Sequence, residues 1–261
     1  MSLITELPRA TWLIFRMHLA TTAGSRRALA GILFGAIPPL FAFLATRLGA
    51  TGESGETIFM YLGVLLLLQV VAPALGVFLG IGAIADETEA RTITYPFTRP
   101  IPRAAVFLGR WLASLVVLST LLLGSGLAMA AATSGAAEPP APDTVRDLLS
   151  TTLVAGLLYS LGAAVIGVLF KRGQVIALGY AFAFEVLLAN VPGSAQKLSL
   201  QFYLRSLFVD AEGAAWRSLE LFERGEFLPP DAAALRIAIT GAVLVLVGCF
   251  AVTRKQFVLS S

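Results

Sequence analysis

The sequence predicts an all-α polytopic membrane protein, and three observations support this fold class. First, 57% of the 261 residues are hydrophobic, and the mean hydropathy is +0.83. Second, only 13% of the residues are charged, roughly half the share found in soluble domains. Third, the apolar residues come in runs long enough to cross a bilayer as helices. Together these features exclude a soluble enzyme, a disordered chain and a coiled coil.

Six of the apolar runs approach the length of about 20 residues that a membrane-spanning helix needs. We expect spans at residues 28–48, 58–84, 106–132, 148–170, 175–191 and 232–252 of a single transmembrane domain that covers residues 1–261. Pro38, Pro39 and Pro73 are expected kink points, because proline removes a helical hydrogen bond. Gly76 and Gly80 have the spacing that lets two helix backbones approach closely.

The 19 Lys and Arg residues are distributed unevenly between the two sides of these spans. Twelve flank the spans on the side that holds both termini, and seven lie on the opposite side. Short basic loops stay cytoplasmic, so both termini are expected in the cytoplasm. The acidic residues show the reverse bias, and Glu185 alone falls within a span. The net charge of +3 is therefore a sign of topology, and no nucleic-acid partner is expected.

Few residues are available for catalysis or metal binding. The single cysteine, Cys249, excludes an intramolecular disulfide and a cysteine-based zinc site. The single histidine, His18, precedes the first span, so a Ser–His dyad or a histidine metal site inside the membrane is not expected. The chain also lacks the Gly-x-x-x-x-Gly-Lys-Ser/Thr motif that cradles nucleotide phosphates. We therefore expect no cofactor on this chain and no enzymatic activity of its own.

Three regions are too polar or too irregular to be plain spans. Residues 8–24 place aromatic and basic side chains on different helical faces, which is typical of a helix lying in the membrane interface. Residues 192–231 are apolar but interrupted, which predicts short helices resting on the outer leaflet. Residues 85–103, between the second and third spans, combine an acidic cluster with a stretch that prolines end. The inner loop therefore suits a short, rigid element with both charge signs, although a solvated turn is the simpler interpretation.

This inner loop carries a resemblance to the permease subunit of type-2 ATP-binding-cassette (ABC) transporters. The matching positions are Glu87 and Glu89, the Thr92-Ile93 step, the prolines and arginines of residues 98–103, and Gly109-Arg110. Two positions depart from the family pattern: Arg91 replaces the usual glycine, and Arg110 replaces the usual lysine.

The resemblance implies a non-catalytic exporter subunit in the inner membrane of a prokaryote. It implies a dimer with an identical or related permease chain, driven by two copies of a P-loop ATPase that bind ATP and Mg. Residues 85–103 would form the coupling helix that docks on the ATPase. The candidate coupling residues are Asp86, Glu87, Glu89, Arg91, Thr92, Arg99, Pro100 and Arg103. A membrane enzyme, a secondary transporter and a structural subunit of a membrane complex remain the alternatives.

The resemblance also places the second and fifth spans along the transport pathway, and each carries one polar residue in an apolar run. These residues are Gln69 and Glu185. An ionised carboxylate at the depth of Glu185 costs several kcal/mol unless it is hydrated, paired or protonated. Two interpretations are open for Glu185: it snorkels or bonds to a neighbouring helix, or it faces a wet pathway between two permeases.

Overall fold

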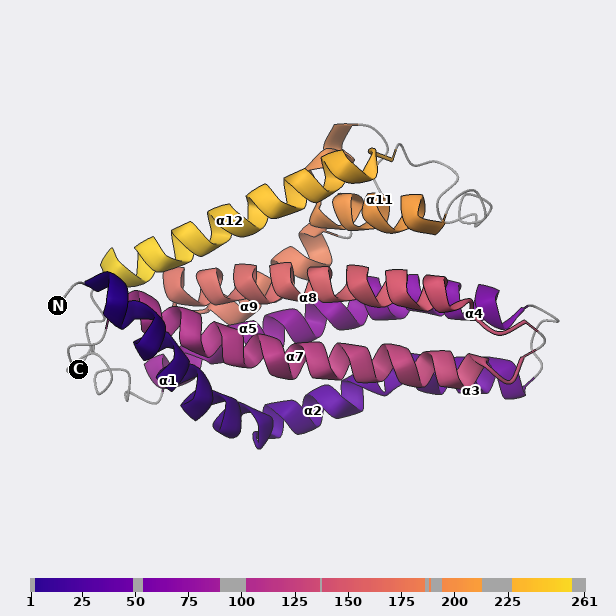
Figure 1. Cartoon of the computed structure of the whole chain (residues 1–261), viewed down its shortest axis with the longest axis horizontal. Helices are drawn as coiled ribbons and strands as arrows, with labels where there is room; N and C mark the ends of the chain where they lie inside the picture. The colour runs from indigo at the N-terminus through magenta and orange to yellow at the C-terminus, as the bar shows by residue number, and fades with distance from the viewer. Residues whose placement is uncertain are drawn as a thin grey trace.

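The computed structural model describes residues 3–48, 54–89, 102–136, 138–185, 188, 194–212 and 227–254. All regular structure in these residues is helical, and no strand occurs among them. Most of the helices run along a common long axis, with α12 inclined to the others and α1 crossing one end (Figure 1). The all-α fold class is therefore confirmed.

Helix α1, Leu3–Ala23, packs against the beginning of α7, Arg103–Thr133. The two backbones lie close together at Gly109, where an added Cβ would come within 2.7 Å of the Thr11 carbonyl oxygen. Trp12, on another side of α1, has 60% of its surface exposed and stacks on Phe15. One face of α1 thus packs on the bundle, and another presents aromatic and aliphatic groups to the surroundings.

The first span is formed by α2, Arg26–Gly35, and α3, Ile37–Arg47. Ser25 begins α2 by accepting a hydrogen bond of 3.2 Å from the Ala28 amide, which satisfies one of the unpaired donors at a helix start. The two helices are separated at Ala36, and α3 begins with the two prolines that the sequence marks as a kink point.

The second span combines α4 (Gly55–Leu62), the π-helix η1 (Gly63–Val71) and α5 (Ala72–Glu89). Pro73 has no N–H to donate to the carbonyl of Gln69, four residues earlier, so the α-helical ladder is interrupted at this point. The π-helix lies just before that proline, and the Ala72 amide bonds to Leu67 O, five residues back. The expected kink at Pro73 is thus accommodated by a widened helical segment.

Helices α7 and α8 (Pro142–Leu169) run antiparallel through the bundle, and α5 packs against α8 at Gly76 and Gly80. A Cβ on Gly80 would collide with the Ser160 carbonyl oxygen of α8, so only glycine allows this approach. The Trp111 indole of α7 donates a 3.2 Å hydrogen bond to the Ser160 hydroxyl. Ser160 therefore lies where three long helices meet.

The chain after α8 is more irregular. It contains α9 (Gly173–Leu178), the π-helix η2 (Gly179–Phe184), the short 3₁₀ helix η3 (Ser194–Leu198) and α11 (Leu200–Glu212). The last described helix, α12 (Pro230–Arg254), packs against α11, α8 and α7. Both α8 and α12 run toward the end of the bundle where α1 begins (Figure 1). The segment between them must therefore carry the chain back across the bundle.

Five helical segments of the described chain are long and apolar enough to cross a membrane. They are Arg26–Arg47, Gly55–Gly82, Arg103–Thr133, Pro142–Leu169 and Pro230–Arg254. The expected fifth span, 175–191, appears as a shorter apolar helix, Gly173–Phe184, and residues 186, 187 and 189–191 lie outside the described part. A six-span layout therefore stays a prediction.

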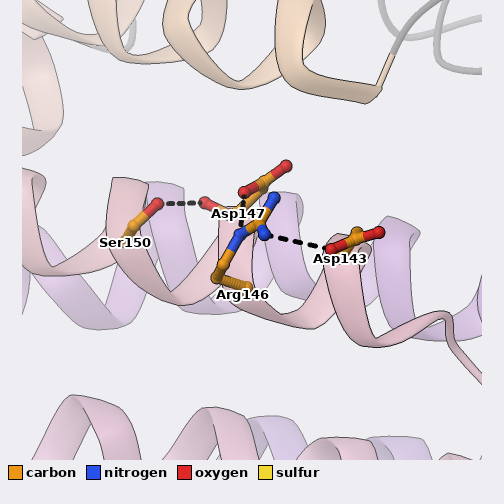
Figure 2. A network of polar contacts seen from close by, with 4 residues as sticks. All are labelled: Asp143, Arg146, Asp147 and Ser150. Carbon is orange, nitrogen blue, oxygen red and sulfur yellow. Dashed lines mark hydrogen bonds and ion pairs between the residues drawn. The ribbon is translucent and has the colours of Figure 1, made fainter.

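The end of the bundle that lies away from α1 carries a polar network at the start of α8. Arg146 forms ion pairs of 3.1 Å with Asp143 and 3.0 Å with Asp147, and the Ser150 hydroxyl donates to the Asp147 carbonyl (Figure 2). The acidic groups in the first turns of α8 interact favourably with its dipole. Because Arg146 is largely exposed, we assign little stability to these pairs.

Candidate functional site

Glu185 follows η2 directly, and its side chain is completely buried, with 0% of its surface exposed. The neighbouring aromatic residues of η2, Tyr180 and Phe184, are partly exposed. The segment thus turns its one acidic group into the protein and part of its aromatic surface outward. This is the arrangement expected when a carboxylate in an apolar run has partners within the fold.

Four donors surround the Glu185 carboxylate. Tyr180 donates its hydroxyl proton to Oε1 at 2.6 Å. The Ser199 hydroxyl donates to Oε2 at 2.7 Å, and the backbone N–H of Gln201 donates to the same oxygen at 3.1 Å. The Tyr159 hydroxyl of α8 reaches Oε2 at 3.5 Å, a long contact that contributes less. The carboxylate therefore connects α8 and η2 to the beginning of α11.

The Gln201 amide belongs to the first turn of α11, where backbone N–H groups have no partner within their own helix. Glu185 satisfies this group from another segment of the chain. A negative charge there also interacts favourably with the positive end of the helix dipole. Hydrogen bonds to a carboxylate are about twice as strong as neutral ones, so this network offsets the cost of burying Glu185.

The π-helix η2 places Tyr180 beside Glu185. In an α-helix, residues five apart point in different directions, whereas the i→i+5 bonding of a π-helix brings them toward the same side. The Glu185 amide bonds to the Tyr180 carbonyl in this way, and the Tyr180 hydroxyl then reaches the Glu185 side chain. Backbone and side-chain geometry at this site are therefore linked.

An apolar cavity of about 190 Å³ adjoins this network. Tyr159, Tyr180 and Thr240 contribute polar groups to its lining, and residues of α5, α8, α9 and α12 form its apolar walls, including Val77, Ala177 and Leu244. The tyrosine rings thus lie between the cavity and the carboxylate. Of the two interpretations of Glu185, the structure shows the bonds to neighbouring segments, and the pathway role stays a prediction.

Gln69 lies in η1 and is half-buried. Both sequence-predicted pathway residues are therefore associated with π-helical segments, Gln69 within η1 and Glu185 immediately after η2. Short π-helical segments occur frequently at functional sites.

The predicted coupling residues are only partly described. Asp86, Glu87 and Glu89 lie on the last turns of α5, and Arg103 is the first residue of α7. Arg91, Thr92, Arg99 and Pro100 lie outside the described residues. The last turns of α5 and the start of α7 both lie toward the end of the bundle where α1 begins (Figure 1).

The fold defines a multi-pass helical membrane protein with a buried, hydrogen-bonded carboxylate beside an apolar cavity. Residues 14–216 match the family described as ABC-2 family transporter protein. Because this match covers more than half of the chain, the protein belongs to the ABC-2 transporter family, and the resemblance noted in the sequence is confirmed. It is a membrane component of an ABC transporter, in a family whose permeases work with an ABC ATPase. No protein of curated function matches the chain.

The partners of Glu185 could not be predicted from the sequence. Tyr159, Ser199 and Gln201 are far from it in the chain, and none belongs to a recognisable motif. The available signal was Ser199 directly before the apolar-periodic residues of α11, a residue type that favours the beginning of a helix. The two π-helices were also missed, because hydrophobic periodicity does not distinguish them from α-helices over such short lengths.

Proposed function

We propose that this protein is the membrane-spanning subunit of an ABC exporter. Two permease chains, identical or related, would form the substrate pathway within the lipid bilayer of a prokaryotic inner membrane. Two copies of a separate ATPase would bind ATP with Mg and drive the cycle. The family match over residues 14–216 carries this proposal.

The need for a partner ATPase follows from the chain itself. The sequence has no phosphate-cradling Gly-x-x-x-x-Gly-Lys-Ser/Thr motif, so ATP hydrolysis is assigned to the other subunit. A docking role for residues 85–103 is supported by the end of α5 and the beginning of α7. Both carry charged residues and lie at the same end of the bundle (Figure 1). Charged pairs at such a contact steer docking and set its register.

The cytoplasmic location of that end is supported by charge. The basic residues of the described chain that flank α2, α7 and the beginning of α9 include Arg26, Arg27, Arg103 and Lys171, at the helix ends that the span order assigns to the side of the termini. Short basic flanks remain in the cytoplasm. The acidic start of α8, with Asp143 and Asp147, would then face outward.

The pathway role is supported by where the polar residues lie. The half-buried Gln69 in η1 and the buried Glu185 after η2 lie on the segments that the family resemblance places along the pathway. Loss of the Glu185 network would release the start of α11, so this residue can influence the outer helices even without touching cargo. Both roles predict that transport depends on Glu185.

The decisive experiment is co-expression of this protein with candidate ABC ATPases from the same genome, purification of the complex, and transport in proteoliposomes. ATP supplied on the ATPase side should drive cargo away from that side, and the ATPase with its phosphate-loop lysine replaced should not. A screen for compounds that stimulate ATP hydrolysis by the complex would identify candidate substrates for this transport assay. If the purified chain binds no ATPase, or transports cargo without ATP, the proposal is wrong.

A further inference from the structure

The elbow between α1 and α2 holds a small open pocket of about 130 Å³, to which several polar side chains contribute. His18 and Thr22 line it from α1, and Arg27 lines it from the first turn of α2. Gly82 of α5 and Ser114 of α7 complete its inner wall. The volume corresponds to about four water molecules, well below a drug-sized pocket. It suits one small polar group.

The length of the first span places this elbow at a membrane surface. Arg26–Arg47 has 22 residues, or about 33 Å of helix, so nearly all of it is needed to cross a bilayer of ~30 Å. The elbow must then lie at the level of the lipid headgroups. The apolar run of the second span ends at Ala85, just before Asp86, and Gly82 near the end of this run lines the same pocket. Two spans therefore place the pocket at the same depth.

The guanidinium of Arg27 is held at the wall of this pocket. Its Cζ lies 5.5 Å from the centre of the Phe78 ring, which is within cation–π distance. A Cβ on Gly82 would collide with Arg27 Nη1, so the absence of a side chain at 82 creates the space that the guanidinium fills. Arg27 is therefore oriented by two features of α5 before any ligand arrives.

Hydroxyl donors are available beside this cation. Thr22 and Ser114 both line the pocket, and each carries a hydroxyl group. Arginine carries five N–H donors, so it can bind an anion in addition to partners within the protein. A guanidinium fork with nearby hydroxyls matches the oxygens of a phosphate group.

The surface beside the pocket is apolar. Leu29 and Leu33, on the outer face of α2, have 61% and 75% of their surface exposed. Acyl chains can lie along this face while a headgroup occupies the elbow. Basic pockets between transmembrane helices at the cytoplasmic surface are typical binding sites for anionic lipid headgroups.

We propose that the elbow pocket binds the phosphate of an anionic phospholipid from the leaflet at this surface. Arg27 bonds to the phosphate oxygens, His18 and the Thr22 and Ser114 hydroxyls complete the site, and the acyl chains follow α2. The site would anchor α1 against α2 and the lipid. This inference depends on the protein spanning a membrane and is independent of the transported cargo.

The test measures lipid binding to the detergent-purified full-length protein by native mass spectrometry. The probes are short-chain phosphatidylglycerol, phosphatidylcholine with the same chains, and inorganic phosphate alone. Arg27→Gln removes the cation, and Arg26→Gln, an exposed neighbour, is its matched control. Gly82→Ala displaces the guanidinium without changing charge. Its control is Gly124→Ala, where an added Cβ meets nothing within 4 Å.

We expect phosphatidylglycerol to bind in preference to phosphatidylcholine. Its Kd should rise about tenfold in Arg27→Gln and in Gly82→Ala, the loss of one charge-assisted hydrogen bond. The two controls should remain within about twofold of the wild type. Should Arg27→Gln fail to fold, Gly82→Ala against Gly124→Ala decides alone. Three outcomes would each overturn the proposal. The first is an equal loss of lipid affinity in Arg26→Gln and Arg27→Gln, and the second is equal affinity for phosphatidylglycerol and phosphatidylcholine. The third is binding of inorganic phosphate but of neither lipid, with the phosphate affinity reduced by the same substitutions.

Discussion

The Tyr180 hydroxyl donates a 2.6 Å hydrogen bond to Oε1 of Glu185, five residues further along the chain. This pair exists because η2 is a π-helix, in which the Glu185 amide also bonds to the Tyr180 carbonyl. The other carboxylate oxygen, Oε2, receives the Ser199 hydroxyl and the Gln201 amide at the start of α11. One side chain therefore connects the widened end of an apolar helix with the beginning of another helix.

Replacing Glu185 separates its structural contribution from its charge. Glu185→Leu removes the acceptor and leaves the Ser199 hydroxyl and the Gln201 backbone amide buried without this partner, at about 1–3 kcal/mol each, and also removes the acceptor of Tyr180. We expect a large drop in Tm of the purified protein and poor expression. Glu185→Gln keeps a carbonyl oxygen as an acceptor, and the hydroxyls of Tyr180 and Ser199 can rotate to accept a hydrogen bond from its side-chain NH₂ group. We therefore expect near-normal expression but altered transport. Normal transport in both variants would remove Glu185 from the functional residues.

The two tyrosines at Glu185 form a matched pair. Tyr180→Phe removes a short hydrogen bond to a carboxylate and should lower the free energy of unfolding by about 1.5–3 kcal/mol. Tyr159→Phe removes the long 3.5 Å contact with Glu185 and the hydrogen bond with the Gln201 side chain, neither of which is a short bond to the carboxylate, and should have a smaller effect. Thermal unfolding of both variants in the same detergent measures the difference. Equal losses in the two variants would contradict the assigned geometry.

Close packing of α5 on α8 depends on Gly80. Gly80→Ala would place a Cβ against the Ser160 backbone, which cannot yield as a flexible side chain can. We expect α5 and α8 to separate, the protein to lose about 1–3 kcal/mol of stability, and the Trp111–Ser160 hydrogen bond to weaken. Gly124→Ala is the control, since a Cβ there has open space. Tm and the fluorescence of Trp111, recorded in a background where Trp12 and Trp216 are replaced by phenylalanine, report both effects.

The acidic end of α5 should couple ATP hydrolysis to transport. We expect Glu87→Lys or Glu89→Lys to preserve membrane insertion while ATP hydrolysis no longer drives transport, because charge reversal disrupts the docking contact. Asp143→Lys, at the opposite end of the bundle on α8, makes the same change and should leave coupling intact. Transport and ATPase rates measured on one proteoliposome preparation give the coupling ratio. Normal coupling in both α5 variants would show that residues 85–103 are only a turn.

Assembly is expected to be dimeric. One chain presents half of a pathway in this family, so we predict two permease chains and two ATPase subunits in each complex. Native mass spectrometry of the detergent-purified complex gives the stoichiometry directly. A complex with one permease chain would count against the prediction.

The fold class and the family could both be predicted from the sequence, because they depend on properties that each segment carries locally. Apolar runs of about 20 residues must be spanning helices in a bilayer, where the backbone can satisfy its hydrogen bonds only within the helix. The charges of the inner loop, from Asp86 to Arg103, likewise carried the resemblance that the family match over residues 14–216 confirmed.

The surroundings of Glu185 were decided by the tertiary structure. The sequence showed one carboxylate in an apolar run and left its partners open, because a hydrogen bond between residues 14 or 26 positions apart leaves no periodic pattern. The π-helical geometry of η2 places Tyr180 beside the Glu185 carboxylate. The packing of the beginning of α11 against this segment places Ser199 and Gln201 beside the same carboxylate. Burial of a charge is a cost that one segment cannot offset alone, so only the packed fold could determine how this one is satisfied.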